Sequence, residues 1–273
     1  MHTDGDTQRE CVSACSGERA KGVPETPFAS LLCEPSKLMA YLRCSAGDVM
    51  PNHELLNSEQ HRHLRVRQRP GADPHFVQIV PAEFVAAAAN CPILLTKHPQ
   101  TGEFYVGAMF GFRAGETLLE NAAARGGFEP LGLLRDGFFI AGESIAVDVD
   151  HPRFSTTEGD PLFDDALMPS TELRHVQRVL GQVQSGIEQS DAFVRALLQF
   201  KLIEPIDITL RFNDSEQLVL QGLYTVSLDR FRELDDADVL QLVRAGHAQL
   251  MYLMNMSLHQ ISRLASLRNA RCS

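Results

Sequence analysis

The run from His75 to Phe112 restricts the possible folds of this chain more than any other segment. It reads HFVQIVPAEFVAAAANCPILLTKHPQTGEFYVGAMFGF, with two apolar, strand-like segments on either side of a polar turn at residues 99–102. Proline fixes φ, and glycine supplies the positive φ that a tight return needs. The run therefore predicts a β-hairpin in which residues 93–97 pair with residues 103–112.

Further strand and helix patterns follow on both sides of this hairpin. Residues 63–69, 76–80, 117–119 and 138–148 read as strands. Residues 81–90 predict a short helix, because proline suits a first helical position and four alanines propagate the helix. An apolar stripe over residues 176–198 predicts a long helix that Ser170 or Thr171 caps and that ends before Pro205.

The last third of the chain predicts another hairpin and a helical end. Residues 206–212 and 218–226 flank a polar turn, and residues 235–267 read as helix with a break at Gly246. We expect the strands at 93–112 and 206–226 to join one sheet, since each pair alone is too small to be stable. The predicted fold class is α+β, a mainly antiparallel sheet with packed helices in a single domain.

Two segments stand apart from this pattern. Residues 1–50 mix Gly, Ser, Pro, Thr and charges without periodicity, and they predict a disordered or loosely attached tail before a domain at 51–273. Residues 151–170 are acidic and rich in proline, which predicts a long, lid-like loop.

The charge and hydropathy of the chain exclude some classes of partner. The formal net charge is −10, which disfavours binding to nucleic acid. One basic stretch, His61 to Arg69, reads most simply as a solvated face; its functional interpretation is an anchor for an acidic partner or an anionic lipid surface. No apolar run approaches the roughly 18 residues of a membrane span. The first residues lack the layout of a signal peptide, so we expect a soluble, cytoplasmic protein.

Cysteines and histidines give no pattern for a metal or cofactor. Four of the six cysteines lie in the first fifty residues without a zinc-ligand spacing, which indicates a reducing compartment. Cys91 lies in an apolar stretch and reads as a small buried side chain. The ten histidines are scattered and have no acidic partner at a recognised spacing. We therefore expect neither a metal nor a cofactor.

No motif in the chain demands a particular reaction. The G-x-S-x-G elbow of hydrolases and the glycine-rich phosphate loops are absent from the sequence. Carboxylates cluster at Glu158, Asp160, Asp164 and Asp165, but their spacing differs from that of an EF-hand loop. The cluster reads as a solvated acidic loop.

The chain from Asn57 to Leu267 resembles the SapC family, named for an S-layer-associated protein of bacteria. The matching pieces are Asn57-x-x-x-His61-x-x-Leu64-Arg65, Val80-Pro81-Ala82-Glu83-Phe84, Pro92-Ile93 with Lys97, Gly111-Phe112-x-x-Gly115-Glu116-Thr117-Leu118, Gly159-Asp160-Pro161-Leu162-Phe163-Asp164, Leu202-Ile203-Glu204-Pro205 and Gly222-Leu223-Tyr224. The resemblance implies a link to the S-layer or the cell surface, which for this chain would require export by a signal-independent route. Similar chains are encoded beside outer-membrane receptors, halogenase-like proteins and oxygenases, and the family supplies no catalytic residues to carry over.

We therefore expect a non-catalytic binding or assembly protein of the SapC type. Its ligand groove would lie near residues 81–112 and 159–165, and its partner would be a protein, a small molecule or further copies of the chain. The alternative is an enzyme, or an accessory partner of an oxygenase or halogenase system that processes a small molecule or peptide. In either case the candidate ligand-binding residues are His61, Glu83, Lys97, Asp160, Phe163 and Asp164.

Overall fold

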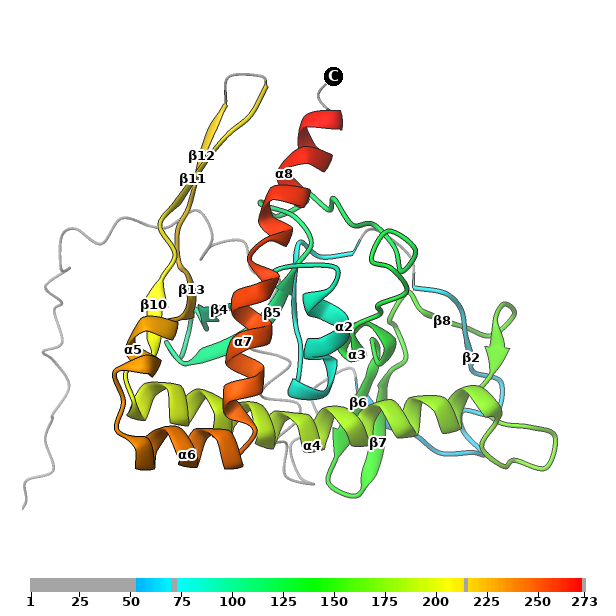
Figure 1. Ribbon diagram of the computed structural model, residues 1–273. Helices are drawn as coiled ribbons and strands as arrows, with labels where there is room; N and C mark the ends of the chain where they lie inside the picture. Colours follow the sequence, from blue (N-terminus) through cyan, green and yellow to red (C-terminus); the bar gives the residue numbers. More distant parts are fainter. Residues whose placement is uncertain (1–52, 70–72, 214–215, 272–273) are drawn as a thin grey trace, which may run out of the picture.

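A five-stranded antiparallel sheet forms the centre of the protein (Figure 1). The computed structural model describes residues 53–69, 73–213 and 216–271; the predicted tail at residues 1–50 lies outside them. The strand order is β10–β13–β4–β5–β3. The five strands are β3 (Phe76–Gln78), β4 (Ile93–Lys97), β5 (Phe104–Met109), β10 (Ile203–Pro205) and β13 (Leu223–Val226).

The predicted hairpin is confirmed. β4 and β5 pair from Ile93 opposite Ala108 to Lys97 opposite Phe104, and Gly102 in the connecting turn has a φ of 71°. All residues of β4 except Lys97 are buried, so this strand runs through the interior of the molecule.

Helices pack against this sheet. α7 (His247–Ser257) contacts β4, β13 and the short helix α2 (Phe84–Ala88), which follows the 3₁₀ turn η1 (Pro81–Glu83). α8 (Gln260–Arg271) continues along the line of α7 in Figure 1. α5 (Leu228–Arg232) and α6 (Asp236–Arg244) precede α7, and Gly246, with a φ of 76°, separates α6 from α7 as the sequence predicted.

The longest helix, α4 (Thr171–Gln199), connects three apolar clusters of the described residues. Its N-cap is Ser170, whose Oγ accepts a hydrogen bond from the Leu173 N–H at 3.2 Å. Residues in its C-terminal part, such as Phe193, belong to the main core around the central sheet. Residues in its N-terminal part, such as Leu173, belong to a second cluster with Phe138. Val179, Val183 and Ile187, in the middle of α4, form a small third cluster with Val80. α4 therefore holds all three clusters in one α+β domain.

Smaller sheets and one short helix surround the centre. β1 (His53–Leu55), β7 (Ser144–Asp148) and β6 (Phe138–Ala141) form one sheet, and β8 (Phe154–Ser155), β2 (Arg65–Val66) and β9 (Asp160–Pro161) form another. β11 (Ile208–Arg211) and β12 (Gln217–Leu220) form a separate hairpin that projects beside α8 (Figure 1). Helix α3 (Leu131–Leu134) follows β5 and precedes β6 in the chain.

Several strand predictions need correction. The strand expected at 63–69 shrinks to β2, because each partner strand, β8 or β9, offers only two residues for pairing. Both of these partners lie inside the segment predicted as a loop at 151–170. Residues 117–119 form no strand, since the N–H groups of Leu118 and Leu119 both bond to the Phe110 carbonyl. The hairpin predicted at 206–226 divides, because β13 pairs with β4 whereas β12 pairs with β11.

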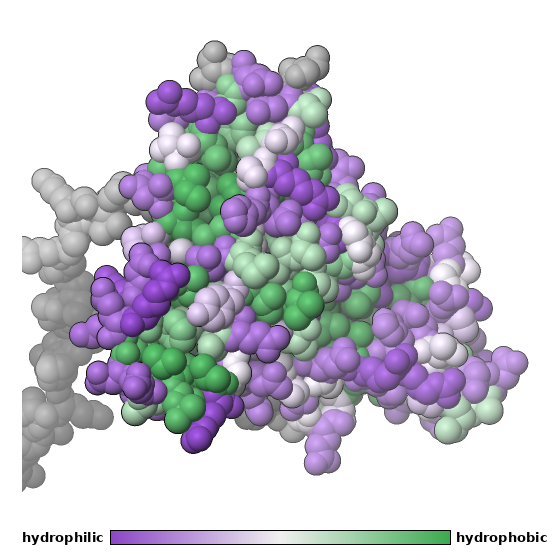
Figure 2. All heavy atoms as spheres, viewed as in Figure 1, coloured by the Kyte–Doolittle hydropathy of each residue, from purple (hydrophilic) through white to green (hydrophobic). Residues whose placement is uncertain are grey.

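The face seen in Figure 2 is largely hydrophilic, with hydrophobic residues gathered between the β11–β12 hairpin and α8 and over α6. On α6 the side chains of Leu240 and Val243 are exposed. Within the described ranges, no helix combines the length and the apolar character that crossing a membrane requires.

Candidate functional site

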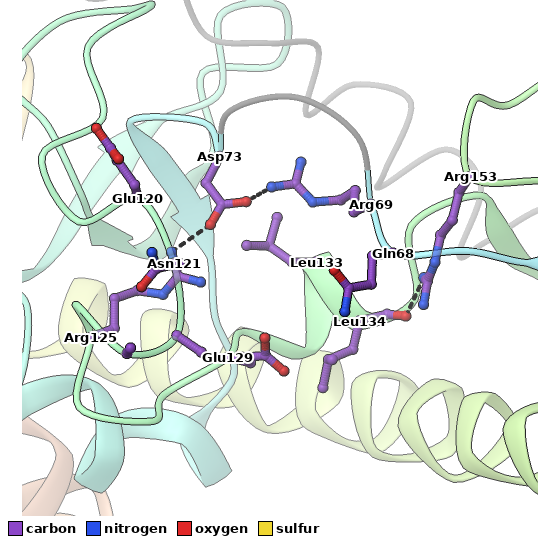
Figure 3. Close-up of a pocket in the computed structure, with 12 residues that line it drawn as sticks. Gln68, Arg69, Asp73, Glu120, Asn121, Arg125, Glu129, Leu133, Leu134 and Arg153 are labelled. Atoms are coloured by element: carbon purple, nitrogen blue, oxygen red, sulfur yellow. Dashed lines mark hydrogen bonds and ion pairs between the residues drawn. The ribbon is translucent and has the colours of Figure 1, made fainter. Parts of the chain in front are cut away.

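A polar pocket of about 570 Å³ lies beside α3. Residues from four segments line it: the stretch on either side of residues 70–72, the loop at 120–129, α3, and the stretch before β8 (Figure 3). The lining comprises three arginines, three acids, two amides and four apolar residues: Arg69, Arg125, Arg153, Asp73, Glu120, Glu129, Gln68, Asn121, Ala122, Ala123, Leu133 and Leu134.

Arg125 is the most firmly held of the three arginines. Its side chain is only 3% exposed, and its guanidinium lies 4.7 Å from the centre of the Phe110 ring. Nε donates to the Phe128 carbonyl at 3.0 Å, and Nη1 donates to the Leu119 carbonyl at 2.9 Å and to Asp73 Oδ2 at 2.5 Å. Nη2 has no hydrogen-bond partner among the described residues, so one edge of a fixed guanidinium is left for another acceptor.

Asp73 joins Arg125 to Arg69. Its Oδ2 accepts from Arg125 while its Oδ1 pairs with Arg69 Nη2, as Figure 3 shows. The Asp73 backbone carbonyl accepts from the Thr117 hydroxyl, which fixes this residue further. One carboxylate therefore holds two guanidinium groups, and Nε and Nη1 of Arg69 have no partner in the described part of the chain.

Arg153 forms the opposite end of the pocket. Its Nη1 donates to the Leu134 carbonyl at 2.5 Å and to the Asp136 carbonyl at 3.1 Å, and its Nη2 lies 3.9 Å from Glu172 Oε1. The side chain is 9% exposed. Arg153 thus ties the C-terminal end of α3 to the first turn of α4.

The three arginines share one electrostatic environment. Burial lowers the pKa of Arg69; Asp136 opposes this change and Arg125 adds to it. Burial likewise lowers the pKa of Arg125 and of Arg153, and in both the negative charge of Glu129 acts in the opposite direction. Guanidinium groups stay protonated in proteins, so the pocket contains three interacting cations.

Two acids lie at the rim of the pocket in different situations. Glu120 forms an ion pair with Arg271 Nη2 at 2.7 Å. Glu129 is exposed and has no hydrogen bond or ion pair with any described residue. Glu129 is therefore the acid that remains available to a cationic group.

Glu83, a candidate from the sequence, does not line this pocket but binds the start of helix α3, which does. Its Oε2 accepts from the Val80 N–H and its Oε1 from the Leu131 N–H, each at 2.8 Å. Leu131 is the first residue of α3, whose Leu133 and Leu134 line the pocket. Burial raises the pKa of Glu83 to about 7, although both backbone bonds act to lower it.

The other candidate residues lie elsewhere. His61 is buried and its Nε2 lies 3.2 Å from Glu54 Oε2, whereas Lys97 is exposed with Nζ 5.0 Å from the centre of the Phe104 ring. Asp160 is exposed on β9, and Phe163 is buried in the second apolar cluster.

Asp164 Oδ1 accepts from the Ala166 and Met168 N–H groups, at 3.0 and 2.9 Å, and so closes its own loop. In the described part of the chain, no hydrogen bond or ion pair joins any two of the six candidates. Their convergence on one ligand stays a prediction.

The pocket residues carried little signal in the sequence. Arg69 belongs to the basic stretch for which an acidic partner was one interpretation, and Arg153 lies in the expected acidic loop. Asp73 and Arg125 are 52 residues apart, and only the fold brings them together. A buried ion pair of this kind has no local spacing rule, so sequence reasoning missed it.

The pocket combines groups that bind and orient a polar molecule. Fixed guanidinium groups bind carboxylate or phosphate oxygens with defined geometry. The four apolar residues of the lining can contact a hydrocarbon group. The buried thiol of Cys91 lies outside this lining and accords with its prediction as a small core side chain, since burial raises its pKa to about 12.

Comparison with known families decides the assignment of the chain. The family model described as SapC matches residues 56–264. The chain belongs to the SapC family. The resemblance seen in the sequence is thereby confirmed, and every residue of the arginine pocket lies inside the part that matches SapC. Searches of curated proteins and of solved structures each found no match.

Proposed function

We propose that this SapC-family chain is a non-catalytic binding protein whose arginine pocket takes a small polar ligand. The observation that carries the proposal is the state of Arg125, a nearly buried guanidinium that is fixed by protein acceptors and still presents Nη2 without a described partner. This Nη2 is not one of the fully buried unpaired side-chain atoms of the described residues, so a molecule in the pocket can reach it. A ligand with acceptor oxygens would supply that partner.

The groove expected near residues 81–112 and 159–165 has weaker support. Its candidates Lys97 and Asp160 are exposed, and Glu83 uses both carboxylate oxygens for backbone N–H groups. The arginine pocket instead gathers charged side chains from four segments around one hollow. We therefore place the ligand there.

A ligand-observed NMR screen of the full chain tests this proposal. The library should contain small acids, amines, amino acids, dipeptides, sugars and nucleotides. Arg69→Gln removes one guanidinium while Arg125 still pairs with Asp73, and Arg67→Gln is the matched control, since Arg67 lies in the same basic stretch outside the pocket. Hits should weaken with Arg69→Gln and persist with Arg67→Gln. The proposal fails if no compound binds, or if hits respond alike to both variants.

A role in a surface layer is a separate prediction that rests on the family name alone. It requires purified protein to assemble into ordered sheets when a divalent cation is added. Electron microscopy across a range of calcium concentrations tests it, and protein that stays dispersed throughout that range would contradict it.

A further inference from the structure

We infer that the pocket binds a small zwitterion of the amino-acid or short-peptide class, with its carboxylate on Arg69 and Arg125 and its ammonium on Glu129. This inference rests on the proposed binding function and names the chemistry of the ligand. It follows from which polar atoms of the pocket are already paired and which remain available.

The binding position of the ligand carboxylate follows from the way in which Arg69 and Arg125 share Asp73. Two guanidinium groups divide the two oxygens of one carboxylate between them, which leaves one positive charge uncompensated in this pair. Counting only the described residues as partners, the donors of this pair that remain are Nη2 of Arg125 and Nε and Nη1 of Arg69. A carboxylate offers two oxygens with about four acceptor positions, which suits donors on two neighbouring guanidinium groups.

A dianion fits this site less well than a carboxylate. Asp73 lies between the two arginines, and Glu120 and Glu129 add negative charge at the rim. The repulsion between these acids and an anion grows with the charge of the anion. The lining therefore favours a singly charged group over a phosphate monoester.

The ammonium end is assigned to Glu129. Unlike Glu120, which is paired with Arg271, Glu129 is exposed and has no bonded partner in the described chain. Its negative charge acts to raise the pKa of both Arg125 and Arg153. Figure 3 shows its carboxylate beside the same hollow as Gln68 and Leu133.

The remaining lining indicates an aliphatic ligand of moderate size. Leu133 and Leu134 of α3, together with Ala122 and Ala123, provide apolar contacts in the lining. The volume of about 570 Å³ exceeds what a single small amino acid fills and falls within the usual range of roughly 300–1,000 Å³ for ligand pockets. An aliphatic dipeptide is therefore a suitable probe.

Isothermal titration calorimetry on the full chain with four probes tests the inference. The probes are leucyl-leucine, its C-terminal amide, its N-acetyl derivative and inorganic phosphate. The zwitterion should bind about tenfold or more tightly than either the amide or the N-acetyl derivative, because each of these lacks one charged contact. Phosphate should bind more weakly than the zwitterion.

Two variants assign the two ends of the ligand. Glu129→Gln should bring the affinity for leucyl-leucine down to that for the N-acetyl derivative and leave the latter unchanged. Arg69→Gln should weaken both ligands that carry a carboxylate and leave the amide unaffected. Since Glu129 is exposed, its substitution leaves the fold intact, which circular dichroism verifies.

The inference is overturned if the N-acetyl derivative binds as tightly as the zwitterion, if Glu129→Gln leaves their difference unchanged, or if phosphate binds best. It is also overturned if none of the peptide probes binds while the NMR screen finds other ligands at Arg69. In each of these cases the proposed binding function stands. A screen that finds no ligand of any class removes both.

Discussion

At the scale of the residue, individual buried charges shape the arginine pocket and the segment packed behind it. Arg125 is nearly buried, and Asp73 is the acid that pairs with its charge, because a buried charge without a partner carries a large cost in free energy. Glu83 differs, since its partners are two backbone N–H groups and no cation. The family motif Val80-Pro81-Ala82-Glu83-Phe84 drew attention to Glu83, but its contact with Leu131 comes from residues 48 positions apart and could not be predicted.

The first prediction concerns the pH dependence of stability. The folded pKa of Glu83 is about 7, above the ordinary value of 4.5, so the folded state holds this proton more tightly than the unfolded state. The contribution of protonated Glu83 to the free energy of unfolding is complete below about pH 4.5 and is lost as the pH rises through 7. The free energy of unfolding should fall by at most about 3 kcal/mol over this range. Glu83→Gln cannot ionise, so urea unfolding of this variant between pH 5 and pH 8 should lack that fall.

Glu143→Gln is the control for this experiment, because Glu143 is exposed. Its unfolding free energy should follow the wild-type pH profile. Parallel profiles for wild type and Glu83→Gln would show that the two backbone hydrogen bonds outweigh burial, and the assigned pKa would be wrong.

At the scale of the element, the sequence predicted elements that local residues decide. The β4–β5 hairpin, the long helix with its Ser170 cap and the break at Gly246 all depend on neighbouring residues, and all are confirmed. Whether the predicted hairpin at residues 206–226 forms depends on contacts with residues far away in the sequence. β13 joins the central sheet through Leu223 opposite Thr96, a pairing that no local pattern encodes.

The second prediction concerns the β11–β12 hairpin, which is separate from the central sheet. A two-stranded hairpin is marginal alone. β11–β12 is anchored by Arg268 of α8, whose guanidinium pairs with Glu216 and with Glu116 and lies 4.1 Å from the centre of the Phe212 ring. Arg268→Met should speed hydrogen exchange at amides of β11 and β12 by about tenfold or more while amides of β4 stay protected.

Arg244→Met serves as its control, because Arg244 is exposed on α6. This variant should leave exchange in the hairpin unchanged. Uniform acceleration over the whole protein with Arg268→Met would instead mean that Arg268 stabilises the global fold and has no special role in the hairpin.

At the scale of the whole molecule, α4 joins the three apolar clusters of the described residues into one folding unit. The sequence predicted a single α+β domain from the succession of elements, and the structure agrees. It could not predict that the buried apolar residues divide into a main core, a second cluster and a small third one, because that division depends on how distant segments pack along α4. The pocket beside α3 arises in the same way, from segments that meet only in the folded chain.

The third prediction tests this coupling at Gly181. This residue lies on α4 between Leu180 of the second cluster and Val183 of the third, and a Cβ there would meet no atom within 4 Å. Gly181→Ala should stabilise the protein by up to about 1 kcal/mol, and Gly181→Pro should cost about 3 kcal/mol or more. Calorimetry should give one transition for wild type and Gly181→Ala and two for Gly181→Pro. Two transitions in the wild type would contradict the role assigned to α4.

The central claim is that the ligand of this SapC-family protein binds to the guanidinium groups of the pocket. NMR signals of arginine side chains, recorded while the full chain is titrated with a hit from the screen, test it most directly. The signals of Arg69 and Arg125 should shift to saturation together, and that of Arg67 should stay in place. Saturation of the protein with both pocket signals unmoved would contradict the claim.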